Sequence, residues 1–139
     1  MIIADTGYWL ALSNRNDKYH KVAIKITENL EEPLITTLPV ITEVCHFLAK
    51  LQGSKSVSAY LLSYADCIYN LHELSASDFY RASELIRKYK DLPMDFADAS
   101  LVILAEYLGH GRILSTDVRD FKALRWKNTK PFKNILLSS

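Results

Sequence analysis

Four acidic residues stand where the chain could build a metal-ion site. Asp5 and Asp117 each follow a short apolar run, and Glu43 and Asp98 lie in segments with helical spacing. If these side chains converge, they repel each other, because two carboxylates 4 Å apart at an effective dielectric of about 20 cost about 4 kcal/mol. A cluster of four therefore requires a cation to stay ionised at pH 7. Carboxylate oxygens favour Mg²⁺ or Mn²⁺, and such ions support phosphodiester hydrolysis by activating water.

The elements that must position these residues alternate between short apolar runs and helical segments. Such alternation predicts an α/β fold, a three-layer α/β/α sandwich around a parallel sheet, in a single domain over residues 1–139. Ligands bind in such sheets at the carboxyl ends of the strands. The predicted strands span residues 2–4, 34–36, 68–74, 112–114 and 134–137. The predicted helices span residues 8–12, 18–30, 38–51, 56–66, 79–90, 95–108 and 120–126.

The helix predicted over 38–51 carries Glu43 among apolar neighbours. Apolar residues at helical spacing predict its buried stripe: Val40, Val44, Phe47, Leu48 and Leu51. Glu43 then has two interpretations. It is either solvated at the edge of this stripe, or held near the sheet edge together with the other acids.

The stretch from Pro93 to Phe121 predicts one helix–strand unit that delivers two acidic groups. Asp95 suits the start of a helix, Asp98 shares its face, and Gly109 suits its end. The strand over 112–114 then leads to Asp117. We therefore expect both acidic groups at one edge of the sheet.

Composition adds few constraints on function. The net charge of +1 implies neither a nucleic-acid nor a membrane partner, and the chain has no run of 18 apolar residues. The first residues lead directly into a strand pattern, so we expect no signal peptide and a cytoplasmic protein. Cys45 and Cys67 are expected to be buried thiols in a reducing compartment.

Charge is unevenly distributed near the C-terminal end. Seven basic residues and two acids fall between residues 112 and 133, with aromatic side chains among them. Such a patch beside a metal pocket would hold RNA phosphates. Arg119, Lys122 and Arg125 are the group we expect to do so, although a plain solvated surface explains any one of them equally well.

Three segments together resemble the PIN-domain family, and within it the VapC-type toxins of VapBC toxin–antitoxin pairs. They are I-I-A-D-T-G, L-P-V-I-T-E-V, and M-D-F-A-D-A-S-L-V-I-L-A-E-Y-L-G followed by I-L-S-T-D-V-R-D-F. The resemblance covers nearly the whole chain in order. It implies a sheet of about five parallel strands and a metal-dependent ribonuclease.

The resemblance also implies roles for individual residues. Its acidic positions fall on Asp5, Glu43, Asp98 and Asp117, which would be catalytic and would hold Mg²⁺ or Mn²⁺. Around them the same motifs place Thr6, Asp95, Ser115 and Asp120. The implied partners are an RNA substrate, a small VapB-type antitoxin and a second copy of the chain in a homodimer. Tyr60, Leu61 and Tyr64 could form the antitoxin surface, or could equally belong to the core.

Other functions fit the sequence less well. A PIN nuclease for RNA processing without an antitoxin stays open, as does a non-catalytic RNA- or protein-binding module. A phosphoaspartyl enzyme would need a second aspartate where Gly7 stands. The four histidines show no pairing suited to zinc, and no P-loop motif is present.

Overall fold

A five-stranded parallel sheet forms the centre of the molecule, in a computed structural model that describes residues 1–137. The strand order is β3-β2-β1-β4-β7, so the first strand of the chain lies in the middle. Parallel neighbours require crossover connections, and the helices between successive strands supply them. The strands are β1 (Ile2–Ala4), β2 (Leu34–Thr37), β3 (Tyr69–His72), β4 (Arg112–Leu114) and β7 (Lys133–Asn134).

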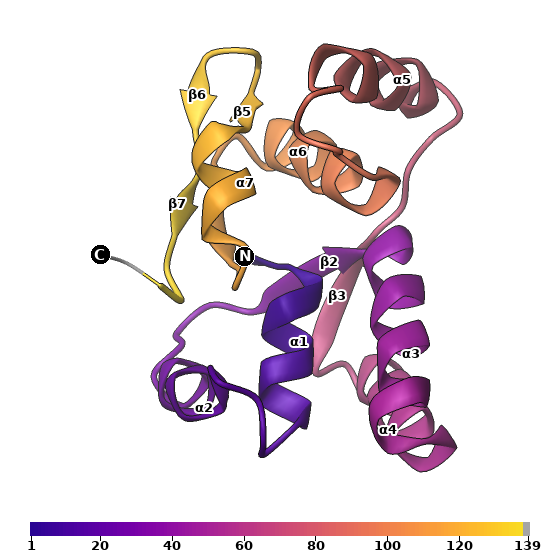
Figure 1. Ribbon diagram of the computed structural model, residues 1–139, viewed down its shortest axis with the longest axis vertical. Helices are drawn as coiled ribbons and strands as arrows, with labels where there is room; N and C mark the ends of the chain where they lie inside the picture. Colours follow the sequence, from indigo (N-terminus) through magenta and orange to yellow (C-terminus); the bar gives the residue numbers. More distant parts are fainter. Residues whose placement is uncertain (138–139) are drawn as a thin grey trace.

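Helices flank this sheet in two groups (Figure 1). α1 contacts α2 and α3, and α3 contacts α4, whereas α5 packs on α6, which lies against β1 and β2. The helices are α1 (Thr6–Ser13), α2 (His20–Glu28), α3 (Leu38–Gln52), α4 (Ser54–Ala65), α5 (Asp78–Lys88), α6 (Phe96–Leu108) and α7 (Val118–Ala123). The predicted α/β sandwich with about five parallel strands is thus confirmed.

Burial explains why the central elements read as nearly continuous apolar runs. All three residues of β1 are buried, and so are residues 99–105 of α6. β1 and the 99–105 stretch of α6 are covered on every side, so neither stretch shows an exposed polar face. The closely packed core around β1 and α6 therefore holds the ends of both elements in place.

Several predicted boundaries were wrong at the C-terminal end. Residues 120–126 do not form one helix, because α7 ends at Ala123 and Arg125–Trp126 (β5) pairs antiparallel with Lys130–Pro131 (β6). The last strand is Lys133–Asn134 rather than residues 134–137. The turn of the hairpin places Lys127 and Asn128 at positive φ (48° and 63°), as a tight hairpin turn requires.

Some side chains also differ from their predicted environments. Phe47 and Leu51 are exposed, because α3 turns only Val40, Val44 and Leu48 (with Ile41) into the core. Tyr60 is buried, so it cannot belong to a docking surface, whereas Leu61 and Tyr64 are exposed. Cys67 is exposed at a turn with φ 62°, and Cys45 is half-buried. In the described part of the chain, no helix has the length and apolar character needed to cross a membrane.

Candidate active site

Asp5 lies at the carboxyl end of the central strand and begins α1. It is 6% exposed, and its Oδ1 accepts a hydrogen bond from the Thr6 N–H at 2.7 Å, so the side chain caps the helix. Burial raises the pKa of the Asp5 carboxyl from 3.8 to about 6, against the lowering effect of its hydrogen bonds from Ser115 and Thr6. Glu43 and Asp117 add to the rise by charge repulsion. Asp5 therefore lies close to two acids that come from separate parts of the chain.

Ser115 joins the ends of β1 and β4. Its buried hydroxyl donates to Asp5 Oδ2 at 2.8 Å and accepts from the Asp117 N–H at 2.9 Å. Asp117 in turn caps α7 by accepting from the Asp120 N–H at 3.1 Å. The hydroxyl thus fixes the position of the loop that carries Asp117 and Asp120 relative to Asp5. Burial, followed by the Asp117 carboxyl, raises the pKa of Asp120.

Asp95 and Asp98 form a capping box at the start of α6. Asp95 Oδ1 accepts from the Asp98 N–H at 2.8 Å, and the Asp95 N–H donates back to Asp98 Oδ2 at 3.4 Å. Burial, then repulsion from Asp95 and Asp5, raises the pKa of Asp98 to about 8. The helix dipole favours negative charge at this end, but it does not offset burial beside two other acids.

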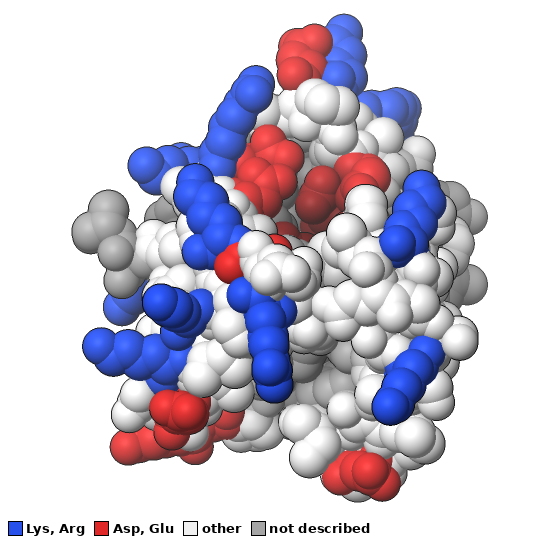
Figure 2. All heavy atoms as spheres, turned by 60° about the horizontal axis from the view of Figure 1, so that its bottom comes forward, with Lys and Arg blue, Asp and Glu red and all other residues white. Residues whose placement is uncertain are grey.

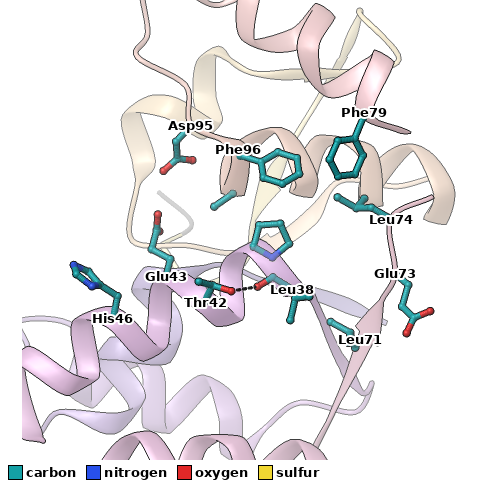
Figure 3. A pocket seen from close by; sticks show the side chains of 12 residues that line it. Leu38, Thr42, Glu43, His46, Leu71, Glu73, Leu74, Phe79, Asp95 and Phe96 are labelled. Carbon is teal, nitrogen blue, oxygen red and sulfur yellow. Dashed lines mark hydrogen bonds between the residues drawn. The ribbon is translucent and has the colours of Figure 1, made fainter. Parts of the chain in front are cut away.

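Glu43 points from α3 toward the same space as Asp95 (Figure 3). Burial raises the pKa of Glu43, and Asp95 adds to the rise, whereas the nearby Thr6 hydroxyl lowers it. That hydroxyl does not reach hydrogen-bonding geometry, since Thr6 Oγ1 is buried without a partner among the described residues. Glu43 therefore lies near the sheet edge, the second of its two interpretations.

The four acids form no ion pair with a basic side chain in the described part of the chain. Within residues 1–137, none of the ion pairs involves Asp5, Glu43, Asp98 or Asp117, although lysines and arginines stand around a hollow that holds acidic side chains (Figure 2). Their charge is thus unbalanced by the protein. This is the opposite of Glu32, whose hydrogen bonds from Arg112 and the N-terminal amine hold its pKa down to about 2.

A hard divalent ion fits this group by its chemistry. The donors are all oxygens, two of the carboxyl groups have pKa values raised to about 6 and about 8, and the Thr6 hydroxyl lacks a partner. Among residues 1–137, however, no three His, Cys, Asp or Glu side chains are arranged to hold one ion. Side-chain rotation would be needed to complete a ligand set.

Two of the three basic residues singled out in the sequence have exposed side chains on the helix that Asp117 caps. Arg119 and Lys122 are exposed on α7, directly after Asp117. Arg125 instead folds back, and its guanidinium donates to the carbonyls of Lys122 and Leu124 at 2.6 and 2.9 Å. Arg125 therefore stabilises the end of α7.

Two features of this edge were not predicted. A pocket of about 870 Å³ adjoins Glu43 and Asp95, with a wall made by Leu38, Phe79 and Phe96. Gly7 also leaves room for Thr116, whose Oγ1 lies 1.8 Å from where a Cβ on Gly7 would be. The D-T-G motif gave a signal for the second feature, whereas nothing local in the sequence signals the pocket.

Comparison with known proteins identifies this architecture. Residues 2–127 match the PIN domain. The chain belongs to the PIN domain family. A similar protein, Ribonuclease VapC26 of Mycobacterium tuberculosis (strain ATCC 25618 / H37Rv), is 27% identical over 124 residues, which is 89% of this chain and 92% of that protein. The family assignment made from the three sequence segments is confirmed.

Solved structures share the PIN-domain fold. The crystal structure of Mycobacterium tuberculosis VapC20, described as a sarcin-ricin loop cleaving toxin, superposes with a TM-score of 0.83 at 21% identity, covering 94% of this chain and all (100%) of that one. A toxin–antitoxin complex from Klebsiella pneumoniae gives a TM-score of 0.66 at 18% identity, covering 89% and 92%. At these identities the likeness concerns the fold.

Proposed function

We propose that this PIN-domain protein is a metal-dependent endoribonuclease that hydrolyses phosphodiester bonds of single-stranded RNA. The observation that carries the proposal is the gathering of Asp5, Glu43, Asp98 and Asp117 at one sheet edge, with no ion pair to any of them among residues 1–137. Such an arrangement is costly unless a cation neutralises it. The similarity to a protein named Ribonuclease VapC26 supports RNA as the substrate.

We assign Mg²⁺ or Mn²⁺ as the cofactor, held by these four carboxylates. When bound, the ion supplies a polarised water and charge stabilisation for phosphodiester hydrolysis. Ser115 orients Asp5 through its 2.8 Å hydrogen bond, and Asp95 positions Asp98 through the capping box. Arg119 and Lys122 hold phosphates of the RNA strand outside the acidic hollow.

The experiment that tests this function compares carboxamide variants. Purified protein is incubated with a pool of short single-stranded RNAs in Mg²⁺, Mn²⁺ or EDTA. Wild type should cleave with either ion and not in EDTA, whereas Glu43→Gln and Asp117→Asn should lose roughly 100-fold in rate, equivalent to about 2.7 kcal/mol. Glu28→Gln, an exposed glutamate on α2, is the matched control and should cleave normally. Cleavage in EDTA, or by Glu43→Gln at the wild-type rate, would refute the assignment.

We further propose that the protein is the toxin of a toxin–antitoxin pair and acts as a homodimer. The toxin–antitoxin complex from Klebsiella pneumoniae, which shares the fold, supports an antitoxin as partner. Expression of the protein alone should arrest growth, and co-expression of the small protein encoded beside it should restore growth. A housekeeping nuclease would cleave RNA without such an effect, and a non-catalytic module would cleave no RNA at all.

A further inference from the structure

The acidic cluster continues into an apolar pocket. Glu43 and Asp95 form one side of this cavity of about 870 Å³, and most of the remaining lining is apolar (Figure 3). The rings of Phe79 and Phe96 lie 5.5 Å apart at 58° and make a continuous aromatic wall. A group bound at the carboxylates therefore has an apolar cavity beside it.

The large apolar side chains that line the pocket are exposed to solvent. Leu38 is 59% exposed, Phe79 57% and Phe96 37%. Exposed apolar side chains that gather around one cavity mark a binding site more often than isolated ones do. These three residues lie in the first turns of α3, α5 and α6, so the pocket lies at the carboxyl edge of the sheet, where ligands of such folds bind.

Charge decides which part of an RNA strand can enter. Within residues 1–137, no lysine or arginine lines the pocket, and its lining includes three acids, Glu43, Glu73 and Asp95, beside one histidine, His46. A phosphate is thus excluded unless a cation accompanies it, whereas a neutral heterocycle is not. Arg119 and Lys122 stand on α7, outside this lining, and suit the phosphates.

We propose that this pocket receives one unstacked base of the RNA, from the nucleotide next to the scissile phosphate. The proposal rests on the proposed ribonuclease function. If the scissile phosphodiester lies at the carboxylates, the base of the adjoining nucleotide is separated from it by one ribose and can reach the pocket. Aromatic side chains bind bases of single strands by stacking, and Phe79 and Phe96 offer such a wall. The pocket then gives the enzyme a base preference at one position beside the cut.

The first test maps cleavage positions. Wild type, Phe79→Ala, Phe96→Leu and Phe47→Ala each digest a randomised RNA pool, and the new ends are sequenced. Phe47 is a matched control because it is 40% exposed on α3 and does not line the pocket. Wild type and Phe47→Ala should enrich one base at one position beside the cut, and both pocket variants should flatten the enrichment at that position alone.

The second test measures binding in the Asp98→Asn background, where RNA cleavage is expected to be roughly 100-fold slower. Removing the base at the enriched position of an oligonucleotide should weaken binding about tenfold, equivalent to about 1.4 kcal/mol and within the range of base–aromatic stacking. Removing both the base and the Phe79 ring should cost no more than removing either, because both changes delete the same contact.

The outcomes separate the pocket from the function. Unchanged enrichment in Phe79→Ala and Phe96→Leu, or additive losses in the second test, would overturn the base pocket while leaving the nuclease intact. The same unchanged enrichment with weaker inhibition by the antitoxin would assign the pocket to a protein partner instead. If wild type cleaves RNA no better than Asp98→Asn, the ribonuclease proposal itself fails, and the pocket proposal fails with it.

Discussion

At the scale of single residues, Asp98 shows the tension between stability and the proposed activity. Its pKa is raised to about 8 by burial and by Asp95 and Asp5, so ionisation at higher pH opposes folding. Asp98→Asn should therefore raise the melting temperature of the metal-free protein at pH 9, by on the order of 5 °C. The same change should reduce RNA cleavage roughly 100-fold.

Thermal denaturation in EDTA and a gel assay for RNA cleavage measure the two effects. Asp91→Asn is the control, because Asp91 is an exposed acid just before α6 and should affect neither quantity. A variant at position 98 that melts lower in EDTA and cleaves normally would contradict both expectations.

Ser115 carries a second prediction at this scale. Ser115→Ala removes the donor to Asp5 Oδ2 and the acceptor for the Asp117 N–H in a buried place. Each buried group that loses its hydrogen-bond partner costs about 1–3 kcal/mol, so the free energy of unfolding measured by chemical denaturation should fall by at least this amount. Cleavage should fall as well, because Asp5 and the Asp117 loop lose their link. In Ser63→Ala, which removes only a solvent-exposed hydrogen bond on α4, stability should stay within about 0.5 kcal/mol of wild type.

At the scale of elements, the contact between α1 and the β4–α7 loop depends on a missing side chain. A Cβ on Gly7 would lie 1.8 Å from Thr116 Oγ1 and 3.0 Å from Thr116 Cβ. Gly7→Ala should push this loop away from α1, lower the free energy of unfolding by about 1–3 kcal/mol and impair cleavage. The double variant Gly7→Ala/Thr116→Gly removes the clash and should recover most of the loss caused by the alanine. Denaturation of both single variants and the double variant measures the coupling, and strictly additive losses would show that the two residues do not meet.

Helices and strands marked by several agreeing sequence patterns could be predicted, whereas those whose position depends on packing against distant residues could not. α6 combined helical spacing, an acidic cap and Gly109, which indeed ends the helix with φ 76°. The β5–β6 hairpin has strands of only 2 residues each, which are too short to show an alternating pattern in the sequence. Acids that follow short apolar runs could be placed at the sheet edge from the sequence. The pocket could not, because its wall depends on where α5 sets Phe79 against Phe96.

At the scale of the whole molecule, the acidic site makes stability depend on pH. The pKa values of Asp5 and Asp98 rise from 3.8 to about 6 and about 8, so the folded protein binds more protons than the unfolded chain between these limits. Stability must then fall as pH rises from about 4 to about 8. Glu32, with its pKa lowered to about 2, acts in the opposite direction only at lower pH, and its exposure makes that effect small.

The metal-free protein should accordingly melt lower at pH 8 than at pH 5, and added Mn²⁺ should reverse most of this difference. Mn²⁺ binds ionised carboxylates, so protons compete with the ion at low pH. The rise in melting temperature at saturating Mn²⁺ should therefore be larger at pH 8 than at pH 5. Melting curves at both pH values, with EDTA or Mn²⁺, measure these shifts. The double variant Asp5→Asn/Asp98→Asn lacks two of the carboxyl groups with raised pKa values, so its melting temperature should change less with pH and Mn²⁺ than that of wild type. Two results on the wild-type protein would contradict this account: the same melting temperature at both pH values in EDTA, or the same rise in melting temperature with Mn²⁺ at each pH. Either would show that repulsion among these carboxylates does not destabilise the folded protein.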